Sequence, residues 1–406
     1  MLGSSGAKSG AGDTSWDTPG SRAVSLGAAG LRHSYILDVN TEEGSAALAA
    51  DLERRFDAGV QAVWADRDFE SLALAAFALQ FAGIAPYRGL CVARGRTPAT
   101  VSRWQDVPAV PATAFKHIDF IAGCGGEPEG VFLTSGTSRG HEIRGRHLVP
   151  RLSLYRHALL PPIRAHLLAG RDRMPFLSLI PSPADRPDSS LSFMVGAAAD
   201  ALATETRWLM DARGALDDGG LRSAIRGSAQ AGQPVLVLAT SLALLHAVER
   251  LEAEEGAPLP PGSRIMETGG FKGAEREISR AELHARLEAT TGVPAHMIVS
   301  EYGMTELLSQ LYEPVLAEGA AASGTYVPPP WLRVRALDPV TLEELPAGAE
   351  GLLAFFDLAN AGSVCHVLTE DVGAVTAGRV RLSGRAKGAE PRGCSLAMDE
   401  LMATAR

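Results

Sequence analysis

Two short apolar runs, each followed directly by a turn of polar and glycine residues, constrain the fold of this chain most. The first run, residues 131–133, leads into Thr134, Ser135, Gly136, Thr137, Ser138, Arg139 and Gly140. The second run, residues 297–299, leads into Ser300, Glu301, Tyr302, Gly303, Met304, Thr305 and Glu306. In open α/β sheets, ligands bind outside the carboxyl ends of the strands. We therefore expect an α/β fold with both turns at strand ends.

The first turn has the composition of a loop that binds a phosphate chain. Glycine lets the backbone approach an anion closely, while hydroxyl groups and successive backbone N–H groups donate hydrogen bonds to phosphate oxygens. Because ordinary loops often share this composition, the first turn indicates phosphate binding only together with the second turn.

The second turn carries side chains suited to a nucleotide. Tyr302 offers a flat face for an adenine ring, Thr305 a hydroxyl group for a phosphate, and Glu306 an oxygen ligand for Mg²⁺. A structural interpretation also exists, in which Tyr302 is a half-buried aromatic residue at a strand end and Glu306 starts a helix. For each residue taken alone, both interpretations stay open.

Taken together, the two turns resemble the adenylate-forming superfamily, whose members join a carboxylate to AMP, and within it the acyl-protein synthetase (LuxE) family. Similar stretches occur at residues 104–111, 115–116, 188–194, 267–273 and 392–396. The resemblance implies the large-domain fold of these enzymes, an α/β fold with layered α/β subdomains plus a β-rich subdomain, and it implies that the full C-terminal lid domain is lacking. A fold shared by diverse enzymes indicates the reaction better than the substrate.

Composition and periodicity divide the chain into three expected segments. Residues 1–32 are dominated by Gly, Ser, Ala and Thr, which predicts a disordered tail. Residues 33–327 are expected to form the α/β core. Residues 328–406 are expected to form the β-rich subdomain and a truncated C-terminal segment.

Local patterns predict several elements of these segments. Apolar residues at helical spacing predict a helix over residues 68–81. The spacing of Ser279 and Glu282 predicts the start of another helix, which Gly292 ends. Apolar runs predict strands at residues 175–180, 234–238, 331–336, 351–358 and 379–383.

The resemblance implies a role for each residue of a candidate ATP site. The residues that would hold the phosphates are Thr134, Ser135, Gly136, Thr137 and Ser138. The residues that would surround the adenine are Gly269, Gly270, Tyr302 and Gly303. Thr305 and Glu306 would act at the α-phosphate, and Glu306 would bind Mg²⁺ together with Thr137.

Two further residues complete this candidate site. Asp371 matches the aspartate that binds the ribose hydroxyl groups, and Arg385 matches an arginine of the hinge region. From the residues alone, a turn carboxylate before Gly373 explains Asp371 equally well, and a solvated surface guanidinium explains Arg385.

Two features depart from the pattern of the superfamily. The first turn does not continue to a Pro-Lys-Gly sequence, and the nearby cations are Arg139, Arg144 and Arg146. The chain also stops at residue 406, before the C-terminal domain that carries a catalytic lysine. Lys272 and Lys387 are candidates to replace this lysine, and both could equally be solvated surface residues.

Cys394 is the candidate nucleophile for acyl transfer. It lies between Arg392 and a predicted terminal helix over residues 395–404, and this position would stabilise its thiolate. Its position is similar to that of the cysteine that becomes acylated in the bioluminescence synthetases. Alternatively, Cys394 is a small buried cysteine without a catalytic role. No CxxC pair occurs, so the sequence suggests neither a disulfide framework nor a zinc site.

Charge and hydropathy exclude several classes of protein. The 38 basic and 47 acidic residues give a net charge of −9, and no basic run interleaved with aromatic residues marks a nucleic-acid-binding surface. The longest apolar run, residues 72–85, is interrupted by Gln80 and Gly83 and is too short for a membrane span. Without a secretory signal, we expect a cytoplasmic protein.

These observations predict an ATP- and Mg²⁺-dependent ligase. It would convert a carboxylic acid to its acyl-AMP, release pyrophosphate, and pass the acyl group to Cys394 and then to an acyl-accepting protein. Two alternatives stay open: direct transfer to a carrier protein, coenzyme A or an amine, and a nucleotide-binding subunit without catalytic activity. The sequence does not indicate which acid is used.

Overall fold

The computed structural model describes residue 3 and residues 42–122, 126–134, 143–252, 258–270, 278–386 and 392–404. Residues 37–406 form one compact unit, and all helices and strands below belong to it. The tail expected at residues 1–32 lies outside the described residues, apart from Gly3.

A six-stranded sheet forms the centre of the α/β part and confirms the expected fold class. Its strands, in spatial order, are β5 (Ala203–Trp208), β4 (Met174–Leu179), β6 (Leu236–Thr240), β7 (Arg264–Thr268), β8 (Ile298–Tyr302) and β9 (Leu311–Tyr312). The first five strands are parallel and β9 is antiparallel to β8. The carboxyl ends of β7 and β8 therefore meet at one edge, where Thr268 and Tyr302 end their strands.

A second sheet has five strands, although the sequence predicted only three of them. The strands are β1 (Val110–Pro111), β12 (His366–Thr376), β11 (Glu350–Asp357), β10 (Leu332–Leu337) and β13 (Arg379–Arg385). The long strand β12 was missed because the polar residues 369–371 interrupt its apolar pattern. Asp371 lies within β12, so its interpretation as a turn carboxylate is wrong.

A two-stranded hairpin precedes the six-stranded sheet in the chain. Strand β2 (Gly130–Leu133) pairs antiparallel with β3 (Arg146–Val149). The connection between them contains the first polar turn. Thr134 is described, whereas Ser135, Gly136, Thr137, Ser138 and Arg139 lie outside the described residues.

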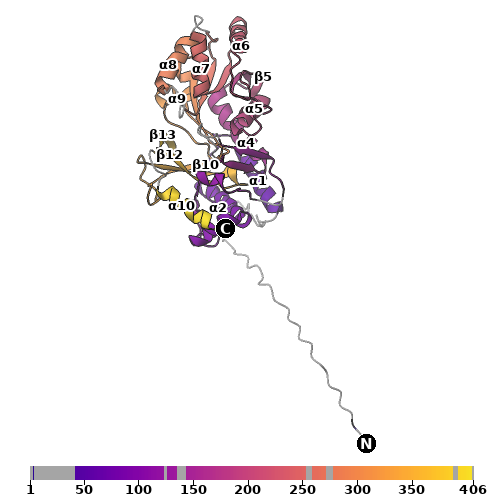
Figure 1. Cartoon of the computed structure of the whole chain (residues 1–406), viewed down its shortest axis with the longest axis vertical. Coiled ribbons are helices and arrows are strands. Elements are labelled where there is room, and N and C mark those ends of the chain that lie inside the picture. Colours follow the sequence, from indigo (N-terminus) through magenta and orange to yellow (C-terminus); the bar gives the residue numbers. More distant parts are fainter. Residues whose placement is uncertain are drawn as a thin grey trace. The chain divides into compact units, whose positions relative to one another are not determined.

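The helices follow the expected α/β order. They are α1 (Glu42–Asp57), α2 (Asp66–Gly83), α3 (Ala85–Ala93), α4 (Leu152–Ile163), α5 (Ser190–Leu202), α6 (Asp218–Ala231), α7 (Ser241–Glu252), α8 (Arg280–Thr291), α9 (Val315–Glu318) and α10 (Arg392–Thr404). Helices α5 and α7 pack against strands of the six-stranded sheet, and α6 and α8 pack against α7 (Figure 1). Helix α10 packs against α3 and β1.

Helix α8 shows how the local sequence sets the boundaries of an element. The Ser279 hydroxyl accepts a hydrogen bond from the Glu282 backbone N–H at 3.1 Å, which satisfies one of the unpaired donors of the first turn. Gly292 ends the helix with a φ of 70°, a conformation that glycine adopts without steric cost. Both predicted boundary signals are confirmed.

Several predicted boundaries differ from those in the structure. Met297 belongs to a short 3-10 turn (Ala295–Met297), and β8 begins one residue later. No helix begins at Glu306, which lies in a turn, so that structural interpretation of Glu306 is wrong. Helix α10 begins at Arg392 rather than at residue 395, which places Cys394 inside its first turn.

Within the described residues, none of the helices has by itself the length and apolar character needed to cross a membrane. Helices α2 and α3 meet the criteria of length and composition only as a pair, and the pair is bent by 110°.

Candidate functional site

Three of the predicted site residues meet between the two large sheets. Tyr302 is the last residue of β8, and its hydroxyl donates a hydrogen bond to Asp371 Oδ2 at 2.7 Å. Arg385 Nε lies 3.4 Å from Asp371 Oδ1. Asp371 and Arg385 are paired neighbours on β12 and β13. The guanidinium of Arg385 is therefore half-exposed but held by an ion pair, rather than only solvated.

The ring of Tyr302 packs against two other aromatic rings. It stacks on Phe355 with a centroid distance of 5.6 Å and an interplanar angle of 20°. The ring of Tyr326 meets it edge-on at 6.4 Å. Burial, together with the nearby Asp371 carboxylate, holds the pKa of Tyr302 well above its usual value, so the phenol stays a neutral donor.

The turn that contains Thr305 and Glu306 touches the hairpin that carries the first polar turn. His147 of β3 lies with its Nδ1 2.7 Å from the Thr305 carbonyl oxygen. Because a carbonyl only accepts, Nδ1 carries the proton. Burial lowers the pKa of His147 to about 4, so the ring is neutral. The side-chain amide of Asn360 donates to the Glu306 carbonyl oxygen at 2.8 Å and supports the turn from the other sheet.

The Glu306 side chain is buried near the ion pair described above. Burial raises the pKa of its carboxyl group to about 7, although the Arg385 guanidinium opposes this shift. In the described part of the chain, no group of three or more His, Cys, Asp or Glu side chains could hold a metal ion. The carboxyl group of Glu306 is an oxygen donor of the kind that Mg²⁺ prefers.

The described cations near the first turn are engaged by the protein itself. Arg144 Nε donates to the Thr134 carbonyl oxygen at 2.6 Å, and its Nη1 donates to Asp188 at 2.9 Å. Arg146 forms an ion pair with Asp119. Thr134 Oγ1 accepts a hydrogen bond from the Gly145 N–H at 2.9 Å. Arg144 therefore fixes the base of the turn in this conformation.

Two residues of the turn after β7 are described. Gly269 and Gly270 are exposed, and Gly269 has a φ of 76°, which favours glycine at this position. The hydroxyl of Thr268 donates to Glu301, the residue before Tyr302. The candidate cations Lys272 and Lys387 lie outside the described residues.

Cys394 lies apart from these contacts and is buried. Its side chain is 2% exposed and packs in an apolar cluster with Leu337, Leu352, Ala354 and Leu368. Its sulfur lies 4.0 Å from the Thr369 carbonyl oxygen. The thiol is therefore not accessible to a large acyl donor in this conformation.

Comparison with known proteins identifies the family that the chain resembles. Residues 231–403 match the family model described as acyl-protein synthetase, LuxE. The resemblance to the LuxE acyl-protein synthetases is confirmed. The matched residues include the Tyr302 turn, the Asp371–Arg385 pair and Cys394.

A curated LuxE-type relative matches over a shorter stretch. Over 79 residues, the chain is 35% identical to the long-chain-fatty-acid–luciferin-component ligase of Vibrio harveyi. The aligned stretch is 18% of this chain and 21% of that protein, so the chain matches about a fifth of the length of this relative.

Solved structures of an adenylate-forming ligase share the fold. 2-Hydroxyisobutyryl-CoA ligase in complex with 2-HIB-AMP and CoA, in its thioesterification state, superposes with a TM-score of 0.59 at 16% identity, covering 80% of this chain and 69% of that chain. Its open conformation gives a TM-score of 0.55 at 16% identity, with coverages of 78% and 69%. At this identity the likeness shows the fold alone.

Sequence reasoning missed three residues that support the LuxE-like site. His147, Phe355 and Asn360 each contact a residue of the Tyr302 turn from a different element. Their identities gave no signal, because each stands alone in an apolar or loop segment. The hairpin partner of residues 130–133 gave no clear signal either, because residues 146–149 are two polar residues followed by two apolar ones and do not alternate.

Proposed function

We propose that this chain activates a carboxylic acid with ATP, forming an acyl-AMP and pyrophosphate, and then passes the acyl group to a thiol. The observation that carries the proposal is the contact of Tyr302, Asp371 and Arg385 beside the Thr305–Glu306 turn, which joins residues of two sheets in one polar site. The family resemblance over residues 231–403 supports the same reaction class.

The first step is an exchange at the α-phosphorus of ATP. A carboxylate oxygen of the acid attacks this phosphorus, and the bond to the bridging oxygen of pyrophosphate breaks. Negative charge increases on the α-phosphate oxygens, so preorganised hydrogen-bond donors and cations accelerate the step. Mg²⁺, when bound, would neutralise phosphate charge.

The residues of the site divide these tasks. Tyr302 would stack on the adenine with the face opposite Phe355, while Asp371 would accept hydrogen bonds from the ribose hydroxyl groups. Thr305 would donate to the α-phosphate, and Glu306 would hold Mg²⁺. The residues proposed to complete the nucleotide contacts are Thr134, Ser135, Gly136, Thr137, Ser138, Gly269, Gly270, Gly303, Arg385 and Lys272.

In the second step, a thiolate attacks the acyl carbonyl carbon and AMP leaves. If Cys394 is this nucleophile, helix α10 must first release the thiol from its cluster with Leu337 and Leu368. The acyl group would then pass from the thioester to a partner protein.

The burial of Cys394 favours one alternative acceptor. An external thiol or amine could attack the acyl-AMP directly, with Cys394 serving only as a packed core residue. The structural neighbour 2-hydroxyisobutyryl-CoA ligase was crystallised with CoA, which is consistent with this route.

Acid-dependent exchange of labelled pyrophosphate into ATP tests the first step. We expect exchange with at least one class of fatty, aryl or amino acid, and an exchange rate about 10²-fold lower in Glu306→Gln. The absence of exchange across all three classes would instead support a nucleotide-binding subunit without catalytic activity. A Cys394→Ser variant then separates the acceptors: retained exchange with lost protein labelling supports the thioester, whereas unchanged acyl transfer contradicts it.

A further inference from the structure

Side chains link strands β7 and β8 at the last two positions where these strands pair. One link lies on each face of the sheet. Glu267 pairs in register with Ser300, whose hydroxyl donates to Glu267 Oε2 at 3.1 Å. Thr268 pairs with Glu301, and the Thr268 hydroxyl donates to the Glu301 carboxylate. Successive side chains of a strand point to opposite faces, so the two links lie on opposite sides of the sheet. Directly beyond them, both strands continue into turns of the candidate site.

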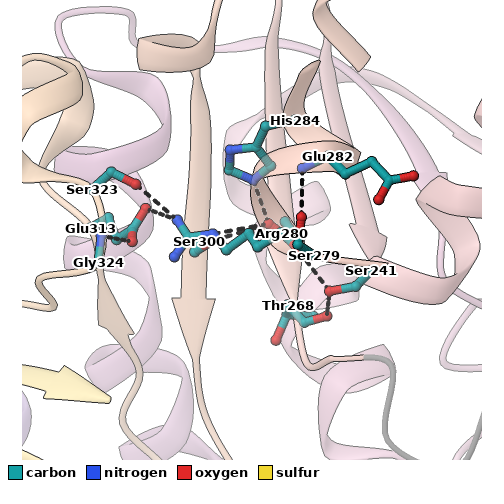
Figure 2. Close-up of polar contacts among 11 residues, drawn as sticks. Ser241, Thr268, Ser279, Arg280, Glu282, His284, Ser300, Glu313, Ser323 and Gly324 are labelled. Atoms are coloured by element: carbon teal, nitrogen blue, oxygen red, sulfur yellow. Dashed lines mark hydrogen bonds and ion pairs between the residues drawn. The ribbon is translucent and has the colours of Figure 1, made fainter. Parts of the chain in front are cut away.

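Glu267 is the centre of the link on the face of the sheet where α7 and α8 lie. Its side chain is 4% exposed. The Ser241 hydroxyl, at the start of α7, donates to Oε1 at 2.7 Å, and His284 Nε2, from α8, lies 2.7 Å from Oε2 (Figure 2). Arg280 Nε lies 3.6 Å from the same oxygen. The Ser241 hydroxyl also lies 3.4 Å from the Thr268 carbonyl oxygen, so the network reaches the backbone that precedes Gly269.

The charges around Glu267 make this arrangement rigid. A buried carboxylate is tolerated only with several donors, and removal of one partner leaves an uncompensated charge. Burial alone would raise the pKa of Glu267, but the hydrogen bond and charge of His284 hold this pKa below its usual value. Arg280 also pairs with the buried Glu313, whose carboxylate accepts from the Gly324 N–H (Figure 2). The network thus joins β7, β8, α7 and α8 to the segment around Glu313.

We propose that Glu267 is a positioning residue for nucleotide binding: through Ser300 and the Thr268 backbone, it holds the Gly269–Gly270 turn and Tyr302 at the separation that an adenine ring requires. This inference rests on the proposed function, because it assigns these two turns to one ATP molecule. A network with only a structural role would change the stability of the fold without selectively changing the affinity for ATP.

Two substitutions and a stability-matched control separate these roles. Glu267→Gln keeps the size of the side chain but places an amide against the donors of His284 and Arg280, and Ser300→Ala removes the hydroxyl that joins β8 to Glu267. Asp217→Ala is the control, because Asp217 caps α6 through the Gly220 N–H at 2.9 Å and, among the described residues, its side chain forms no hydrogen bond or ion pair with β7 or β8. Loss of this cap lowers the stability of the fold.

The affinity for ATP is measured by calorimetry and the Michaelis constants by pyrophosphate exchange, below the unfolding temperature of every variant. We expect the KM and Kd for ATP to rise about tenfold in Glu267→Gln and about threefold in Ser300→Ala, as for a displaced binding group, with the KM for the acid unchanged. Asp217→Ala should lower the unfolding temperature without changing the affinity for ATP.

Unchanged affinity for ATP in a folded Glu267→Gln variant would overturn the proposal. If Glu267→Gln does not fold, unchanged affinity in Ser300→Ala overturns it instead. A lack of ATP binding by the unsubstituted protein would overturn the proposed function itself, which is a separate result.

Discussion

At the scale of single residues, the raised pKa of Glu306 predicts how nucleotide binding depends on pH. With a pKa of about 7, the Glu306 carboxyl group is largely protonated at pH 6 and charged at pH 8. Mg²⁺ requires the charged form, so the KM for ATP at limiting Mg²⁺ should fall as the pH rises from 6 to 8. Glu306→Gln should lose this dependence and lower the exchange rate about 10²-fold.

The comparison with Glu306→Gln is necessary because ATP itself titrates near neutral pH. Only the ratio of the KM for ATP of the unsubstituted protein to the KM of the variant reports on the Glu306 carboxyl group. Glu343→Gln, which changes an exposed carboxylate, is the matched control. A ratio that does not change with pH would contradict the assignment of Glu306 to Mg²⁺.

Glu301 gives a second prediction, this time about stability. Burial raises the pKa of Glu301 from its ordinary value of 4.5 to about 7, although the Thr268 hydroxyl opposes the shift. Between these two pH values the folded state binds more protons than the unfolded state, so stability falls as the pH rises through this window. Glu301→Gln removes the titration. Between pH 4.5 and pH 8, the free energy of unfolding of the variant should therefore rise, relative to that of the unsubstituted protein, by on the order of 1–3 kcal/mol.

Urea unfolding of both proteins at pH 4.5 and pH 8 measures this difference. Glu343→Gln, which changes an exposed carboxylate, is unfolded under the same conditions as the control. If the difference between Glu301→Gln and the unsubstituted protein is the same at both pH values, the carboxyl group of Glu301 does not change its charge on folding in this range.

At the scale of elements, the docking of α10 on α3 controls the access to Cys394. Gly89 of α3 leaves room for Thr404 of α10, since a Cβ atom at Gly89 would lie 2.6 Å from the Cβ of Thr404. An ion pair of 2.7 Å between Arg94 and Glu400 and a hydrogen bond from the Thr404 hydroxyl to the Pro86 carbonyl oxygen add to this contact. The end of α10 is thus held by a close backbone approach.

Gly89→Val should displace α10 and expose the thiol. We expect the rate of Cys394 alkylation, measured by peptide-resolved mass spectrometry, to rise at least tenfold, as expected when about 1.4 kcal/mol of docking free energy is lost. Gly227→Ala in α6 is the control, because a Cβ atom there has no heavy atom within 4 Å and should stabilise the helix by about 1 kcal/mol. An alkylation rate that stays at the unsubstituted level in Gly89→Val would show that this contact does not protect Cys394.

At the scale of the whole molecule, the sequence predicted strand ends better than it predicted contacts between elements. Residues 131–133 and 297–299 were recognisable because apolar runs end in polar turns, and this is a local property. Strand β12 was missed because polar residues 369–371 interrupt its apolar pattern, and of these Asp371 contacts Tyr302 of the other sheet. The pairs Tyr302–Asp371 and His147–Thr305 depend on how the sheets pack, and no local pattern contains that information.

Cys394 shows the same limit of local sequence patterns, here for the burial of a residue. Its position beside Arg392 predicted a stabilised thiolate at a helix terminus, with a small buried cysteine as the alternative. In the structure, the helix begins three residues earlier than predicted, and packing against β10, β11 and β12 buries the side chain. Burial of a residue depends on distant segments, so the sequence around Cys394 could not predict it.

The central claim is that the first polar turn and the Tyr302 turn bind one ATP molecule, and a double-mutant cycle on ATP affinity tests it directly. Calorimetry with Mg²⁺ gives the stoichiometry and the Kd for the unsubstituted protein, Thr137→Ala, Glu306→Gln and the double variant. If both residues act on the same Mg²⁺–ATP, binding has a stoichiometry of one and the two effects are coupled by about 1 kcal/mol or more. Effects that add within about 0.5 kcal/mol, or single variants that bind ATP as well as the unsubstituted protein, would contradict the claim.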